Sequence, residues 1–454
     1  MSKFSPFHGA ARDLCLCAAL AVICAFALRW WFVHGGLIPD PLVGDAIHYS
    51  NYAWNLAHFH TFSMAPPGSD KVLPDSYRDP GYPLLLAVLL RLLGSGDEWY
   101  HAVLLVQIVL GALSAGLTVL VSGRWLEARA ALAAGLAVAV WPHCVAISGY
   151  LLSETLCGFM VLLGFWLLLR ASESAGAARW AAAGLGFGAA ALVNATIAPF
   201  GILLALILWF RQMVPRRPAL ALLLGAAILP GAWTARNASL STDSTASSRA
   251  VANLVQGSWP DYQAAFMNTV FRGDDWAKAT MAAIDRDNDL AASSLRAWLG
   301  VLFSRIEQHP LHYAAWYAYK PALLWAWSIR IGIGDVYPHH TLHPIYSTSA
   351  VMRVFESFCV GINPVLFVLM TAAVLVVLLR PVASASSVGL YTAALLVAYE
   401  TFVYTVLQAE PRYSIPFRPE QMILVATAMA WLLRTWGRYR NQPHAATNIV
   451  SNGA

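Results

Sequence analysis

The sequence predicts an all-α protein that crosses a membrane many times, and three observations lead to this fold class. Apolar residues make up 58% of the 454 residues, and only 12% are charged. The mean hydropathy of the chain is +0.57. Stretches of about 20 mainly apolar residues, the length that crosses a bilayer as a helix, recur along the sequence. Because soluble domains carry about 25% charged residues, an ordinary soluble enzyme is excluded.

We expect about ten transmembrane helices, within a range of about nine to eleven because some of the stretches are short. They lie at residues 14–33, 102–121, 130–146, 154–169, 180–198, 200–210, 220–235, 358–379, 390–407 and 421–433. These positions divide the chain into four parts. They are an N-terminal transmembrane module at 1–236, an outer segment at 237–350, C-terminal helices at 351–440 and a cytoplasmic tail at 441–454 that we expect to be disordered.

Basic residues gather on one side of this arrangement. They are Lys3, Arg12, Arg124, Arg129, Arg170, Arg179, Arg211, Arg216, Arg217, Arg380, Arg434, Arg438 and Arg440. Short cytoplasmic loops are enriched in Lys and Arg, so this side, with both chain ends, is expected to face the cytosol. The opposite side then faces the periplasm or the outside of the cell. The net charge of +5 is explained by topology, and no nucleic-acid partner is expected.

The first outer loop, residues 34–100, has an unusual content for a loop beside a membrane. It contains G-D-A-I-H-Y at 44–49 and Y-R-D-P-G-Y-P at 77–83. Tyr and apolar residues at helical spacing predict an interfacial helix at 46–60, which places Asp45 at its positive N-terminus. Taken alone, Asp45 is either a functional acid or a helix cap. Residues 84–93 are too short to span and predict a second interfacial helix.

Charged residues from distant parts of the sequence reach the same outer side. Glu154 lies where an outer turn enters the fourth predicted span, and Arg236 lies at the end of the seventh. Glu410 and Arg412 lie in the turn between the last two spans. Ionisable residues at a membrane are either functional or ion-paired, and local content does not decide between these alternatives.

The outer segment at 237–350 is rich in Ser, Thr, Asp and Asn and contains no cysteine. It predicts a small, mostly helical periplasmic cap with helices near 274–285 and 289–308. Tyr and Trp crowd residues 312–329, which predicts a helix lying at the outer membrane interface. His339, His340 and His343 are close enough to be considered metal ligands. Asp335 is the only acid near them, so no metal site is expected.

The outer charges suit one kind of chemistry. A carboxylate can accept a proton from an acceptor hydroxyl, and arginines can bind a phosphate leaving group. Transfer of a sugar from a polyprenyl phosphate needs these parts. A transporter or flippase of lipid-linked glycans is an alternative, favoured by Glu400 within a predicted span. A non-catalytic membrane subunit is another.

Six motifs in this order resemble the GT-C membrane glycosyltransferases, in the bacterial branch related to protein O-mannosyltransferases and lipid A aminoarabinose transferases. They are G-D-A-x-x-Y at 44–49, R-D-P-G-Y-P at 78–83, S-E at 153–154, W-T-x-R-N at 233–237, H-P-x-x-Y at 309–313 and R-Y-x-x-P at 412–416. The resemblance extends from Leu14 to about Arg434. It implies a GT-C fold and an inverting transfer from a lipid-phosphate sugar to a glycan, lipid or protein of the envelope.

The resemblance also implies roles for single residues. Asp45 matches the acid that acts as base or orients the acceptor. The positions expected to bind the donor phosphate or lipid are Arg78, Tyr82, Arg412 and Tyr413. The positions expected to support the site are His48, Tyr49, Glu154, Arg236 and Glu410. Asn194 departs from the family, whose members often carry Arg there. No cofactor is expected, and dependence on a divalent metal stays an open alternative.

Overall fold

The structure, a computed structural model, describes residues 6–173, 176–242, 244–327, 340–379 and 388–440. The tail at 441–454 lies outside these residues, as does His339, one of the histidines considered as metal ligands and not expected to bind a metal. The regular secondary structure of the described residues is helical, apart from two isolated bridges between Leu37 and Leu342 and between Ser76 and Thr245.

The helices of the first half are α1 (Pro6–Gly35), α2 (Asp45–Phe59), α3 (Gly81–Leu93), α4 (Asp97–Ser122), α5 (Ala128–Val140), α6 (Pro142–Ala146), η1 (Ile147–Gly149), α7 (Glu154–Ser172), α8 (Ala177–Val193), α9 (Ile197–Phe210) and α10 (Arg216–Ala238). Those of the second half are α11 (Ala246–Gly257), α12 (Tyr262–Phe271), α13 (Asp275–Ser293), α14 (Leu295–Gln308), α15 (Pro310–Leu324), α16 (Ile345–Thr348), α17 (Ala350–Leu379), α18 (Val388–Val406), η3 (Pro411–Phe417) and α19 (Arg418–Arg440).

A helix occurs at each of the predicted spans. By length and composition, six described helices can cross a membrane: α1, α4, α7, α10, α17 and α18. The pair of α5 with α6 and η1 qualifies as a seventh, bent span, and α8 and α9 are shorter apolar helices. The protein is therefore an all-helical, multi-pass membrane protein.

One predicted span, at 130–146, is broken. The helix axis bends by 56° between Val140 and Pro142. Proline has no backbone N–H and disfavours a helical conformation at the residue before it, and Trp141 has an extended backbone. The buried guanidinium of Arg29 donates to the carbonyls of Ala139 at 3.0 Å and Val138 at 3.4 Å. Arg29 thereby donates hydrogen bonds to carbonyl groups that lack a helical N–H partner because the helix breaks here.

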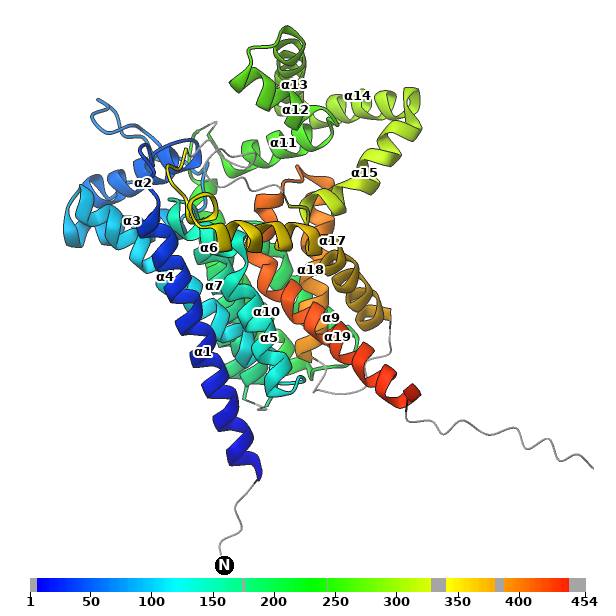
Figure 1. The fold of residues 1–454 in the computed structure, drawn as a ribbon. Coiled ribbons are helices and arrows are strands. Elements are labelled where there is room, and N and C mark those ends of the chain that lie inside the picture. The colour runs from blue at the N-terminus through cyan, green and yellow to red at the C-terminus, as the bar shows by residue number, and fades with distance from the viewer. Residues whose placement is uncertain (1–5, 174–175, 243, 328–339, 380–387, 441–454) are drawn as a thin grey trace, which may run out of the picture.

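Two short helices lie at the end of the bundle that carries the first loop, as expected. The predicted interfacial helices correspond to α2 and α3, which pack on one another. Gly81 at the start of α3 lies against α8, since a Cβ there would approach Val193 to 2.7 Å. Figure 1 shows α2 and α3 at the opposite end of the bundle from the start of α1 and the end of α19.

The segment after α10 forms a helical cap above the bundle (Figure 1). Helices α11, α13, α14 and α15 share a core that includes Val255, Ile284 and Trp298. The predicted boundary between its two helices near residue 287 is wrong: α13 continues to Ser293, and Ser294 caps α14 by accepting from the Ala297 amide at 3.2 Å. Figure 1 shows α15 descending from α14 to the bundle, so it links the cap to the spans.

Candidate active site

The site begins at the turn that leads into α2. Gly44 has a φ of 55°, a conformation that a side chain would strain, and Asp45 is the first residue of the helix. The N-cap position belongs to Gly44, which has no side chain. The carboxylate of Asp45 instead binds two arginines, so the structure does not favour the alternative that Asp45 is a helix cap alone.

The Asp45 carboxylate lies between two guanidinium groups. Its Oδ1 accepts from Nη2 of Arg78, and its Oδ2 accepts from Nη2 of Arg412 at 2.7 Å. The side chain of Asp45 is 18% exposed. Burial raises the pKa of Asp45, but the charges of Arg412 and Arg78 outweigh burial and hold that pKa well below its ordinary value. Asp45 is therefore ionised at every physiological pH.

Glu154 extends this chain of charges. Nε of Arg412 lies 3.1 Å from Oε1 of Glu154, the first residue of α7. The side chains of Arg412 and Glu154 are each 9% exposed. Arg412 thus joins carboxylates from α2 and α7, and the Arg78–Asp45–Arg412–Glu154 sequence of contacts is called the charge cluster below.

His48 and Tyr49 hold the other side of Arg78. The Nδ1 atom of His48 accepts from Nε of Arg78 at 3.2 Å and lies 2.8 Å from its Nη2. Burial and then the charge of Arg78 lower the pKa of His48, which suits an imidazole that accepts from a cation. The Tyr49 ring lies 5.4 Å below the Arg78 guanidinium, a cation–π distance.

Glu410 is a third carboxylate near Arg412, and its pKa is shifted in the opposite direction from that of Asp45. Burial raises the pKa of Glu410 to about 7, opposed in part by the charge of Arg412. The nearby charges of Asp45 and Glu154 also contribute to this rise. Glu410 is therefore close to half-ionised at neutral pH, in contrast to Asp45.

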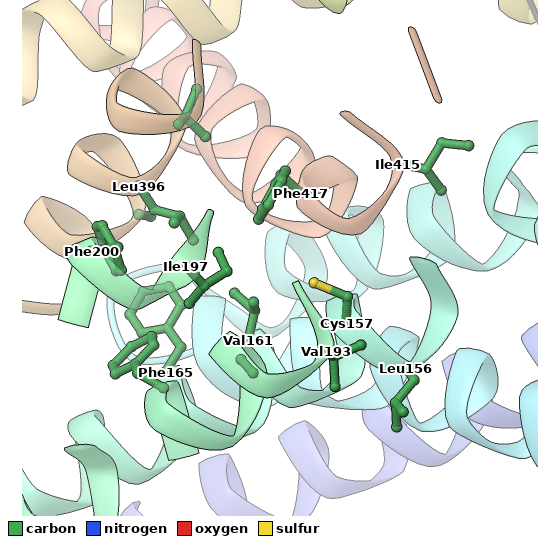
Figure 2. Close-up of a cluster of buried hydrophobic side chains, with 14 of the residues drawn as sticks. Leu156, Cys157, Val161, Phe165, Val193, Ile197, Phe200, Leu396, Ile415 and Phe417 are labelled. Atoms are coloured by element: carbon green, nitrogen blue, oxygen red, sulfur yellow. The ribbon is translucent and has the colours of Figure 1, made fainter. Parts of the chain in front are cut away.

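The short helix η3 places Arg412 over α7. Figure 2 shows Ile415 and Phe417 of η3 in one apolar cluster with residues of α7, α9 and α18. Gly158 allows this approach, because a Cβ there would lie only 2.9 Å from the Pro416 carbonyl oxygen. Tyr413 stacks on Tyr404 of α18 with ring centroids 5.0 Å apart. The packing of η3 on α7 and α18 thus fixes the position of Arg412.

Two predicted site residues, Tyr82 and Arg236, lie beside the charge cluster and bind groups outside it. Tyr82 is fully buried, and its hydroxyl donates to Oε1 of Gln107 at 2.8 Å. Its ring packs edge-on against Tyr49, with centroids 5.1 Å apart. Arg236 donates to the Asp75 carbonyl at 2.6 Å and lies over the Trp233 ring. Tyr82 and Arg236 therefore orient the elements that carry the cluster.

Asp79, next to Arg78 in sequence, faces a different partner. Its two oxygens accept from Nη2 of Arg249 in α11 at 2.8 and 2.9 Å. Its Oδ2 also accepts from the Ala195 amide at 3.2 Å. Asp79 therefore links the first outer loop to the cap and to the turn after α8, while Arg78 serves the charge cluster.

Three residues that organise the site were not predicted. Asp75 accepts from the Tyr52 hydroxyl and from the Met64 amide at 2.7 Å, which folds the loop between α2 and α3. Lys320 is fully buried in α15 and donates to the carbonyls of Gly257 and Leu407. Arg249 is the third. Only Lys320 carried a signal in sequence, as a lone cation in an aromatic stretch.

Within the described ranges, no group of three or more His, Cys, Asp or Glu side chains is placed to hold a metal ion. His340 and His343 lie in this part of the chain, after α15.

Residues 77–233 match the family model of dolichyl-phosphate-mannose-protein mannosyltransferases. The matched segment starts next to Arg78 and includes Glu154, but it covers less than half of the chain. No curated protein matches the chain significantly in sequence.

The fold is similar to that of larger membrane enzymes. The Archaeoglobus fulgidus oligosaccharyltransferase tethered with an acceptor peptide has a TM-score of 0.52 at 14% identity, covering 93% of this chain and 50% of that one. Its apo form gives 0.50 at 14% identity, with 93% and 51% coverage. ArnT from Cupriavidus metallidurans bound to undecaprenyl phosphate gives 0.45 at 14% identity, with 93% and 61% coverage. The chain thus spans about half the length of the oligosaccharyltransferase.

Proposed function

We propose that the chain is a membrane glycosyltransferase of the GT-C superfamily and that it transfers a sugar from a polyprenyl-phosphate donor to an envelope acceptor on the periplasmic face. The acceptor is a glycan, lipid or protein. The observation that carries the proposal is the charge cluster, in which two arginines from distant segments converge on one carboxylate. The matched family, by its name, uses a polyprenyl-phosphate sugar, which supports the donor class.

The donor phosphate is the natural competitor of Asp45 for the two arginines. Guanidinium groups bind phosphate in the same paired geometry as carboxylate. A phosphate that binds Arg78 and Arg412 takes over contacts that Asp45 makes in the free protein. Asp45 then loses the charges that hold its pKa down, and it becomes a stronger base. Donor binding and activation of Asp45 are thereby coupled.

The transfer step is an inverting displacement. The acceptor hydroxyl oxygen attacks the anomeric carbon, the bond from that carbon to the phosphate oxygen breaks, and the hydroxyl proton passes to Asp45. Polyprenyl phosphate leaves with the electron pair of the broken bond. Arg78 and Arg412 stabilise the negative charge that develops on the phosphate, and His48 holds Arg78 in position.

The transporter alternative has one observation in its favour. Glu400 is fully buried within α18, and a carboxylate at such a position is a feature of transport pathways. We give preference to transfer because the paired charges gather at one end of the bundle. A Glu400→Gln variant separates the two functions, since transfer in a cell-free assay does not require transport.

The proposal is tested by mass spectrometry of lipid-linked sugars and envelope glycans in cells with and without the protein. We expect a polyprenyl-phosphate sugar to accumulate in cells without it, while one glycan, lipid or protein loses a sugar. Wild type and the matched variant Asp70→Asn, whose carboxylate is exposed in the same loop, should restore that sugar. Asp45→Asn should not. Unchanged glycans, or full restoration by Asp45→Asn, would remove the basis for transfer at this site.

A further inference from the structure

A groove runs along the flank of the bundle, away from the charge cluster. Helix α19 packs against both α5 and α17, whereas α5 and α17 do not pack closely on each other. The space between them has a volume of about 670 Å³. Its walls are apolar and include Ala137 of α5, Ile362 of α17 and Val425 of α19. This volume is in the range of about 300–1,000 Å³ typical of ligand pockets.

The two ends of the groove differ. Trp141, Cys359 and Met422 close the outer end, where Trp141 and Met422 are 4% and 3% exposed. The first half of α17 crosses the bundle at this end, and the helix then turns downward (Figure 1). Pro364 lies in the middle of α17, where the missing N–H permits a change of direction. Among the residues that the structure describes, no charged residue lines the outer end of the groove.

The opposite end carries the charged residues that line the groove within the described part of the chain. Arg129 lies at the start of α5, Arg434 lies near the end of α19, and Glu127 precedes α5. Arg129 and Arg434 are exposed, and neither has a hydrogen bond or ion pair with another side chain in the described part of the chain. The distribution of basic residues assigns this end to the cytosolic side.

We propose that this groove is a binding site for an anionic phospholipid of the cytosolic leaflet. An acyl chain lies along the apolar walls between α5, α17 and α19, and the headgroup phosphate lies between Arg129 and Arg434. Basic pockets between transmembrane helices at the cytosolic surface bind anionic headgroups in this manner. Because Glu127 offsets one of the two arginines, the net charge at this end of the groove is about one positive unit, which favours a single phosphodiester.

The polyprenyl donor is a less suitable occupant. Its phosphate has to reach Arg78 and Arg412, and neither residue lines the groove. A prenyl chain that entered from the outer end would have to pass Trp141 and the crossing half of α17. Because Arg129 and Arg434 lie at the cytosolic end of the groove, they favour a headgroup from the cytosolic leaflet.

The test uses full-length protein purified in mild detergent and stripped of lipid. Phosphatidylglycerol or phosphatidylcholine with the same acyl chains is added, and native mass spectrometry measures the bound lipid. We expect one phosphatidylglycerol to bind at least tenfold more tightly than phosphatidylcholine. Arg129→Gln with Arg434→Gln should weaken phosphatidylglycerol binding about 20- to 30-fold, because each basic residue near a membrane surface contributes about fivefold.

Two further variants make the result specific. Arg179→Gln with Arg217→Gln removes the same charge from exposed positions outside the groove and should leave binding unchanged. Ala133→Phe narrows the groove at an exposed position while keeping both arginines, and it should weaken binding of the acyl chain. The proposal would be overturned if both double variants lost binding equally, or if the two lipids bound equally well. It would also be overturned if polyprenyl phosphate displaced phosphatidylglycerol and did so equally well in an Arg78→Gln variant.

Discussion

Buried arginines occur in two regions of this molecule and are neutralised in different ways. In the charge cluster, Arg78 and Arg412 face the carboxylates of Asp45 and Glu154. Within the bundle, Arg418 donates to the Asn363 and Gln421 side chains and to the carbonyls of Trp325 and Ala326. Arg29 similarly donates to backbone carbonyls at the break before Pro142.

The difference separates function from architecture. A carboxylate partner can be replaced by a phosphate, because both are anions with oxygen atoms at similar spacing. A backbone carbonyl that belongs to a helix end cannot leave without a change in the fold. The charge cluster is therefore suited to exchange partners during a reaction, whereas Arg29 and Arg418 stabilise the helix ends on which the site rests.

The largest effect on stability is expected at Arg418. Arg418→Met leaves several buried acceptors without a donor, at about 1–3 kcal/mol for each that stays unpaired, so we expect a loss of about 3 kcal/mol. Thermal unfolding in detergent should show a clear fall in Tm, while kcat of the remaining folded protein stays within about twofold. Arg353→Met, at an exposed position of α17, is the control and should leave Tm unchanged. A stable Arg418→Met protein with much lower kcat would reverse the assignment of the two regions.

At Arg412 we expect the opposite pattern. Arg412→Ala removes a donor that contacts two carboxylates, and charged hydrogen bonds of this kind contribute about 1.5–3 kcal/mol. We predict a fall of about 100-fold in kcat/KM for the donor, with Arg412→Lys keeping part of the activity because it retains the charge. Steady-state kinetics over a range of donor concentrations measures this. Unaltered donor kinetics in Arg412→Ala would exclude Arg412 from phosphate binding.

A pH dependence is expected from Glu410. As pH rises through about 7, Glu410 ionises and adds a negative charge near the position proposed for the donor phosphate. A donor phosphodiester keeps its charge over this range, so its KM should rise by up to about tenfold between pH 6 and pH 8. Glu410→Gln should remove the dependence. A kcat that instead rises with pH and is lost in Glu410→Gln would make Glu410 the base.

The smallest effect is expected at the link between the first loop and the cap. Arg249→Ala breaks the contact with Asp79 but leaves the charge cluster in place, so we expect a decrease of about fivefold in kcat. Asp79→Asn should have a similar effect, and the double variant should be no worse than either single one. Additive losses in this double-mutant cycle would show that the two residues act separately.

The sequence predicted the fold class well because spans are long and apolar. It also predicted a helix at 46–60 with Asp45 at its N-terminus, because helical spacing is a local signal, and α2 begins at Asp45. The pairing of Asp45 with Arg412 is not local: the two residues are 367 positions apart. Topology placed both residues on the outer side, but only the structure shows that their side chains meet.

Other features depend on packing that periodicity does not report. Pro142 is a local signal for a break in the helix. The apolar content of residues 130–146 nevertheless predicted one continuous span. The contact between Asp79 and Arg249 requires the cap to fold back on the first loop, and no pattern in residues 237–350 specifies that position. The length of α13 also depends on the shared core of the cap.

The most direct test of the account is single-turnover sugar transfer by purified protein in lipid nanodiscs, with a polyprenyl-phosphate sugar as donor. Wild type, Asp45→Asn and Asp70→Asn are compared at equal amounts of folded protein. The account predicts that Asp45→Asn binds the donor at least as tightly as wild type, because the donor no longer competes with a carboxylate, yet transfers at least about 100-fold more slowly. Asp70→Asn should match wild type. Transfer by Asp45→Asn at the wild-type rate would contradict the account.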